Sequence, residues 1–110
     1  MQPTDPKTTN PQSPKAELVQ EIYGGELYEC YPLGKYIVSA PGICGGRPIF
    51  KHTRLEVSAV LASIASGETI EQVVQAYAHS RLTPGAVREA IRLADQALVQ
   101  SAEILQPAIA

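Results

Sequence analysis

The residues with the most reactive side chains in this 110-residue chain are two cysteines and two histidines. Cys30, Cys44, His52 and His79 could each ligate a metal, yet no two of them stand at the short spacing typical of a zinc site. Cys44 has no general base paired with it, as a nucleophilic cysteine would need. The sequence therefore predicts no metal, no cofactor and no enzyme, with a small enzyme using Cys44 as the least favoured reading.

A glycine-rich loop spans residues 41–48 and reads PGICGGRP. It lacks the Gly-Lys-Ser/Thr ending of a nucleotide-binding P-loop. We expect its glycines to serve tight turns that need positive φ. The alternative is an anion site, in which Arg47 places its guanidinium beside the backbone amides of Gly45 and Gly46.

The distribution of basic residues favours nucleic acid more than the net charge of −2 does. Residues 35–54 carry four cations and no acid. Lys51 and Arg54 in this stretch could grip backbone phosphate. A local cluster of basic residues can bind phosphate groups even when the rest of the chain is close to neutral. The alternative is that these charges only keep an exposed loop solvated.

The clearest predicted element is a helix that begins at Pro84. Thr83 is a suitable N-cap, Pro84 fits the first helical position, and Leu82 can staple onto Val87. If the helix runs to about residue 105 it is about 33 Å long. Its apolar face is too wide for two short helices to cover, so we predict a homodimer.

The polar face of the same helix carries Arg88 and Arg92, with Arg81 in the turn before it. Arginine can hydrogen-bond guanine edges or phosphates. The alternative is that Arg88 and Arg92 pair with Glu89 and Asp95 at a spacing of three residues and only solvate the helix.

Periodicity predicts a mainly α protein with a three-helix helix-turn-helix unit preceded by a small β-hairpin. Residues 26–31 and 36–38 alternate as a hairpin, and Ile49-Phe50 could be a brief third strand. Two helices precede the long one, over residues 55–65 and 69–77, and the second opens with the capping box Thr69–Gln72. Residues 18–23 could form a short helical turn.

Three segments follow from these patterns: a disordered or weakly ordered leader over residues 1–21, the hairpin and glycine-rich loop over residues 22–54, and the helical unit over residues 55–110. Four prolines lie within the first 15 residues. The sequence shows neither an apolar run of about 20 residues nor a secretory signal. We therefore expect a cytoplasmic protein with reduced cysteines and no membrane contact.

Several short segments together resemble one family. They are PGICGGRP at residues 41–48, Thr53-Arg54, GETIEQVV at residues 67–74, Tyr77, Leu82-Thr83-Pro84 and REAI at residues 88–91. The chain resembles the family called domain of unknown function 433 from Tyr28 to Leu98. The resemblance implies a homeodomain-like fold and, from some members regarded as antitoxins, binding to operator DNA and inhibition of a PIN-like ribonuclease toxin.

Two positions depart from that family's usual pattern. His52 stands where glycine usually precedes Thr-Arg, and residues 78–81 replace a short Tyr-Pro turn. The sequence as a whole predicts a dimeric DNA-binding regulator of antitoxin type, whose DNA contacts are Arg88, Arg92, Arg81, Arg54 and Lys51. The alternative is a protein-binding adaptor that does not touch DNA and receives its partner on the hairpin or the acidic leader.

Overall fold

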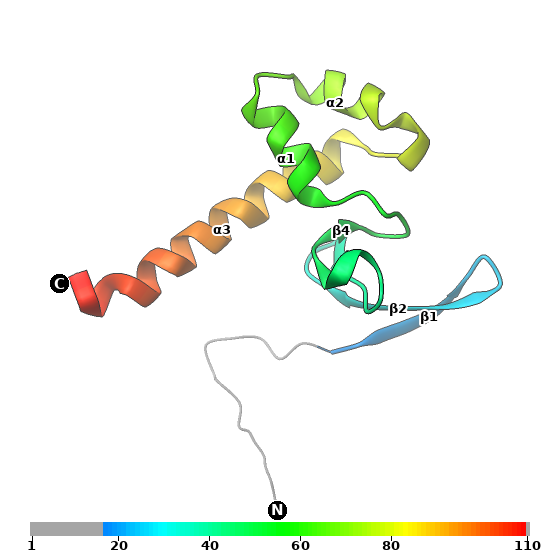
Figure 1. Ribbon diagram of the computed structural model, residues 1–110, viewed down its shortest axis with the longest axis horizontal. Helices are drawn as coiled ribbons and strands as arrows, with labels where there is room; N and C mark the ends of the chain where they lie inside the picture. Colours follow the sequence, from blue (N-terminus) through cyan, green and yellow to red (C-terminus); the bar gives the residue numbers. More distant parts are fainter. Residues whose placement is uncertain (1–16, 110) are drawn as a thin grey trace, which may run out of the picture.

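The computed structural model describes residues 17–109, with side chains described up to Leu105. An antiparallel sheet in the order β1-β2-β3-β4 lies beside three α-helices (Figure 1). The elements in chain order are β1 (Val19–Tyr23), β2 (Glu26–Pro32), β3 (Ile37–Ser39), the 3-10 turn η2 (Cys44–Gly46), β4 (Ile49–Phe50), α1 (Val57–Ala65), α2 (Ile70–Ala76), the 3-10 turn η3 (Ala78–Ser80) and α3 (Pro84–Ile109).

The fold is α+β, and the predicted mainly α architecture with a three-helix helix-turn-helix unit is wrong. The predicted helical turn over residues 18–23 is strand β1, which pairs along its whole length with β2, from Val19 opposite Cys30 to Tyr23 opposite Glu26. Gly24 and Gly25 both have positive φ and form the turn between these strands. A strand with few buried residues gives no clear periodicity, so the short apolar pattern was ambiguous. The first 16 residues of the predicted leader lie outside the described residues.

The other predicted strands are confirmed. β2 pairs with β3 through Tyr31 opposite Ser39, and β3 pairs with β4 through Val38 opposite Ile49. The glycine-rich loop folds over this part of the sheet, where Cys30, Val38, Ala40 and Ile49 form a small buried cluster.

The main core lies between the sheet and the helices. Ile37 and Phe50 from the strands contribute to it together with Val60 of α1, Val73 of α2 and Val87 of α3. The sheet thus covers part of the wide apolar face of α3, which the two shorter helices were not expected to cover by themselves. Burial of these side chains fixes the loops before α1 and α3, which carry Lys51, Arg54 and Arg81.

The predicted helix starts are confirmed in detail. The capping box of α2 is present, with the backbone N–H of Gln72 donating to Oγ1 of Thr69 at 3.1 Å. Thr83 caps α3, because its Oγ1 accepts from the backbone N–H of Ala86 at 3.2 Å. Leu82 and Val87 are both buried in the main core, as the predicted staple requires.

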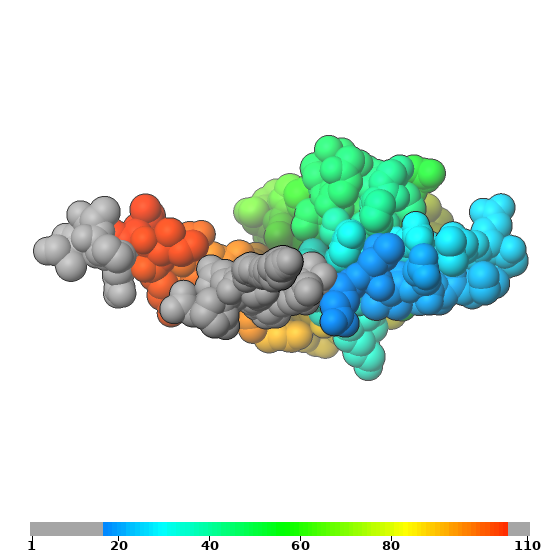
Figure 2. Space-filling model, turned by 90° about the horizontal axis from the view of Figure 1, so that it is seen from below, coloured from blue at the N-terminus to red at the C-terminus, as the bar shows by residue number. Residues whose placement is uncertain are grey.

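The two halves of α3 differ in their surroundings. Ala86, Val87, Glu89 and Ala90 are buried, whereas every residue from 94 to 105 is exposed. Figure 2 shows the end of α3 protruding from one side of the molecule and the β1–β2 hairpin from the other.

Candidate functional site

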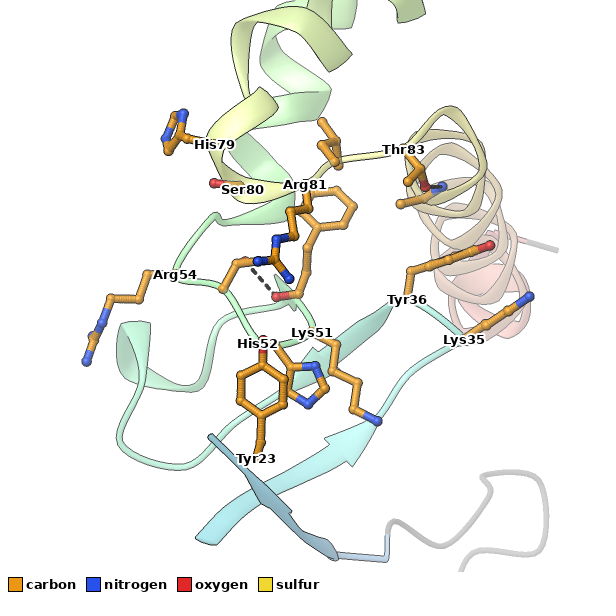
Figure 3. A pocket seen from close by; sticks show the side chains of 14 residues that line it. Tyr23, Lys35, Tyr36, Lys51, His52, Arg54, His79, Ser80, Arg81 and Thr83 are labelled. Carbon is orange, nitrogen blue, oxygen red and sulfur yellow. Dashed lines mark hydrogen bonds between the residues drawn. The ribbon is translucent and has the colours of Figure 1, made fainter. Parts of the chain in front are cut away.

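A cleft of about 800 Å³ lies between the end of β1, the turn after β4 and the beginning of α3 (Figure 3). The loop before β3 and the turn η3 close its remaining sides. Its lining residues are Tyr23, Lys35, Tyr36, Phe50, Lys51, His52, Thr53, Arg54, His79, Ser80, Arg81, Leu82, Thr83 and Ala86.

The cleft is lined by bases and by no acid. Four of its lining residues are lysines or arginines and two are histidines, and none is aspartate or glutamate. In such a cleft the electrostatic potential is positive, which raises the local concentration of anions. The chemistry of the lining therefore suits a phosphate-bearing ligand.

A tight turn after β4 presents Lys51, His52 and Arg54. The hydroxyl of Thr53 closes this turn by donating to the carbonyl of Phe50 at 2.6 Å and accepting from the backbone N–H of Leu55 at 3.0 Å. The backbone N–H of Lys51 also donates to the carbonyl of Tyr36, at 2.8 Å. The turn is consequently held at both ends, and its basic side chains start from a fixed backbone.

His52 adopts a backbone conformation that favours glycine, with φ of 65°. Its ring stacks on that of Tyr23 with centroids 3.7 Å apart, and its Nε2 lies 2.9 Å from Oε1 of Glu21. The backbone N–H of His52 donates to the phenolic oxygen of Tyr28 at 3.1 Å. Position 52 is therefore left-handed although it is not glycine, and the contacts of His52 with Tyr23, Glu21 and Tyr28 connect the β1–β2 hairpin to the cleft.

Glu21 also pairs with Lys51, whose Nζ lies 2.9 Å from its Oε2. Hydrogen bonds from Lys51 and His52 lower the pKa of the Glu21 carboxyl, and the same contact raises the pKa of Lys51. Lys51 is thus partly neutralised from the hairpin side, so its charge toward the cleft is weaker than the sequence suggested.

Arg81 is the basic residue whose side chain extends over the cleft. It ends η3 in the left-handed conformation, with φ of 58° and ψ of 33°. Its side chain extends over the cleft, whereas Arg54 and His79 point away from the centre (Figure 3). Within residues 17–105, Lys35, Arg54 and Arg81 form no salt bridge, so their charges are available to a ligand.

The two arginines predicted on α3 do not line the cleft. Arg88 is exposed, and Arg92 lies near Glu89, with Nη2 to Oε2 at 3.4 Å. The sequence grouped Glu89 with the exposed polar face, but it is 4% exposed and accepts backbone N–H bonds from Lys35 at 2.8 Å and Tyr36 at 2.7 Å. Of the five predicted DNA contacts, the structure brings together Lys51, Arg54 and Arg81.

The glycine-rich loop forms a separate feature. Gly45 and Gly46 have positive φ, as the turn interpretation requires. Arg47 is bound by both carboxylate oxygens of Glu56, at 2.8 and 3.0 Å, which lowers the pKa of Glu56. Its guanidinium is therefore committed to a partner within the chain and is not directed at a free anion site.

Sequence reasoning missed several residues of the cleft, among them Tyr23, Lys35, Tyr36, His79 and Thr83. The basic stretch over residues 35–54 was the signal for Lys35. Among the residues described, no three of histidine, cysteine, aspartate and glutamate form a group that could hold a metal ion. No helix in the described part of the chain is long and apolar enough to span a bilayer.

The fold and the cleft define a small α+β protein with a cation-lined cleft. Residues 37–94 match the family model described as "Protein of unknown function (DUF433)", and the chain belongs to this family, as the sequence resemblance indicated. It is also 38% identical over 58 residues to the "Uncharacterized protein y4eO" of Sinorhizobium fredii (strain NBRC 101917 / NGR234). The match covers 53% of this chain and only 24% of that relative's length. No solved structure matches the chain significantly.

Proposed function

We propose that the protein is a cytoplasmic DNA-binding regulator of antitoxin type that holds the phosphate backbone of duplex DNA at the cationic cleft. The observation that carries the proposal is the lining of the cleft, which combines four lysines and arginines with no carboxylate. A ligand with regularly spaced negative charges satisfies such a surface, and duplex DNA carries one negative charge for about every 1.7 Å of its axis.

Three of the four lysines and arginines that line the cleft form no salt bridge within residues 17–105, and they are placed differently around it. Arg81 extends over it, Arg54 projects outward from the turn after β4, and Lys35 lies beside α3 (Figure 3). The amino end of α3 adds its partial positive charge at the same edge, where Thr83 lines the cleft. Arg88 lies further along α3 and is exposed, so we assign it base contacts rather than backbone contacts.

The proposal predicts a steep dependence of DNA affinity on salt, because each phosphate contact releases counterions. The test measures binding of a duplex carrying the chain's own promoter at several salt concentrations. The double variant Arg54→Ala and Arg81→Ala should bind more weakly at low salt. Its slope of log affinity against log salt should be shallower by about 0.9 for each lost phosphate contact.

The matched control is Arg47→Ala, which removes a positive charge that Glu56 already holds outside the cleft. This variant should bind the duplex almost as the unmodified protein does. A loss of binding free energy in the control about half as large as in the double variant, which removes two charges instead of one, would mean that net charge, and not the cleft, determines binding. An unchanged affinity in the variant lacking Arg88 would remove the base-contact role of that residue.

A second candidate function is protein binding without DNA, favoured by the β1–β2 hairpin. Ile22 and Leu27 face each other across its end and are 73% and 60% exposed. An exposed apolar pair of this kind suits a docking partner, and the family resemblance makes a PIN-like ribonuclease toxin the partner to test.

Calorimetry with the product of a neighbouring toxin-like reading frame tests this second function. Ile22→Glu with Leu27→Glu should abolish toxin binding and leave DNA affinity unchanged if the two surfaces are separate. If the hairpin variant instead binds the toxin with the same affinity as the unmodified protein, the hairpin is not the docking surface.

A further inference from the structure

Over residues 94–105, the second half of α3 buries none of its side chains against the part of the chain that the structure describes. The helix contacts α1, α2 and β3, and all of its buried residues lie in its first half. From residue 94 to residue 105 every side chain is exposed, with Leu98 at 70%. An isolated helix of this length is only marginally stable in water, so this half is expected to gain its stability from a contact outside the monomer.

An apolar groove of about 370 Å³ lies beside the middle of α3. Its walls come from the loop before β3, from α1 and from the small side chains of α3 itself. The residues that matter here are Leu33, Val57, Leu61, Ala90, Ala94 and Ala97. Alanines let a second helix approach α3 closely, as in other tightly packed helix pairs.

We propose that a second copy of this chain covers both features, with the exposed half of its α3 lying antiparallel along α3 and beside the groove. The exposed apolar residues have the spacing for this contact, because Ile91, Leu98 and Leu105 recur every seven residues. Ala94 and Ser101 lie between them. Ser101 donates its hydroxyl to the carbonyl of Ala97 at 2.9 Å, so it brings no unsatisfied polar group into the contact.

The distribution of charges along α3 favours an antiparallel over a parallel orientation of the two helices. The exposed charges of its first part are Arg88 and Arg92, while residues 94–105 carry Asp95 and Glu103 and no base. Antiparallel pairing centred on Leu98 places Glu103 of each copy opposite position 93 of the other, next to Arg92, and it also opposes the two helix dipoles. A parallel pair would place like charges together along the whole contact.

The contact must include the groove as well as the helix face. Residues 91–105 form a strip about 22 Å long on a helix about 10 Å wide. That strip is smaller than the about 800 Å² per partner buried in a typical stable interface. The groove walls on α1 and before β3 supply the additional apolar area, and a twofold axis makes the contact reciprocal. This inference goes beyond the proposed function, since the dimer needs no nucleic acid.

Sedimentation at about 10 µM without DNA tests the proposal. The unmodified protein should be a dimer, and Leu98→Glu should raise the dissociation constant at least about 100-fold, because each dimer would bury two unpaired carboxylates. Val99→Glu is the matched control, since Val99 is also exposed but lies about 100° further round the same helix. Far-UV circular dichroism should show both variants folded. A monomeric unmodified protein, or equal dissociation of the two variants, would overturn the proposal.

Disulfide cross-linking tests the orientation, in a background with Cys44→Ser. A mixture of the Ile91→Cys and Leu105→Cys proteins should form the mixed disulfide, since antiparallel pairing centred on Leu98 brings these two positions together. Leu105→Cys by itself should remain uncross-linked. Efficient self-linking of Leu105→Cys would show a parallel pair and would overturn the antiparallel arrangement, whatever the outcome of the DNA experiments.

Discussion

Replacement of Glu89 by alanine should destabilise the protein far more than its place on a charged helix face suggests. The carboxylate accepts two short hydrogen bonds from the backbone N–H groups of Lys35 and Tyr36, and it is almost fully buried. Hydrogen bonds to a charged group contribute about 1.5 to 3 kcal/mol each. The loop before β3 can regain part of this from water, so we expect Glu89→Ala to lower the free energy of unfolding by about 3 kcal/mol.

Gly34 gives an independent test of the same contact. A Cβ at this position would lie 2.6 Å from Cδ of Glu89, which is too close for the carboxylate to stay in place. Gly34→Ala should therefore push the carboxylate away and also cost about 3 kcal/mol, because both hydrogen bonds are lost. The double variant should be about as stable as Glu89→Ala, since the contact can be lost only once.

The assay is equilibrium unfolding in urea, followed by far-UV circular dichroism at fixed protein concentration. Glu68→Ala, which removes an exposed carboxylate between α1 and α2, should change the free energy of unfolding by less than about 0.5 kcal/mol. Additive losses of unfolding free energy in the double variant would refute the reasoning. If the losses of Gly34→Ala and Glu89→Ala sum within about 0.5 kcal/mol in the double variant, the two sites do not share one contact.

Three further predictions concern the hairpin and the thiols. The pKa of Glu21 is lowered by hydrogen bonds from Lys51 and His52, so its contribution to stability is present above the ordinary pKa of 4.5 and is lost as the pH falls through the lowered folded-state value. The stability difference between the unmodified protein and Glu21→Gln should shrink at acid pH, and a constant difference would contradict this. His52→Gly should be more stable than His52→Ala by about 1 kcal/mol in urea unfolding, because a left-handed residue other than glycine is strained; equal stability would refute the strain. Alkylation of the native protein at about pH 8 followed by mass spectrometry should label Cys44 well before the buried Cys30, whose pKa burial raises, and equal rates would be inconsistent with the core described.

Much of the site could be predicted from the sequence as a set of residues, but not as a geometry. The basic stretch over residues 35–54 and Arg81 were visible as charges, and three of the five predicted DNA contacts line one cleft. The pairing of Lys51 with Glu21 was not visible, because the partner comes from a strand 30 residues earlier. The stacking of His52 on Tyr23 depends on the same strand.

The sequence by itself determined the elements whose signals are local. The capping box at Thr69 and the cap at Thr83 act within one or two helical turns, so they could be predicted directly from the sequence. Only the tertiary structure decided that residues 19–23 form a strand and that Glu89 is buried. A strand exists through its hydrogen bonds to a neighbour, and a carboxylate is buried only when distant backbone donors satisfy it. Neither partner is recorded in the local spacing of the residues.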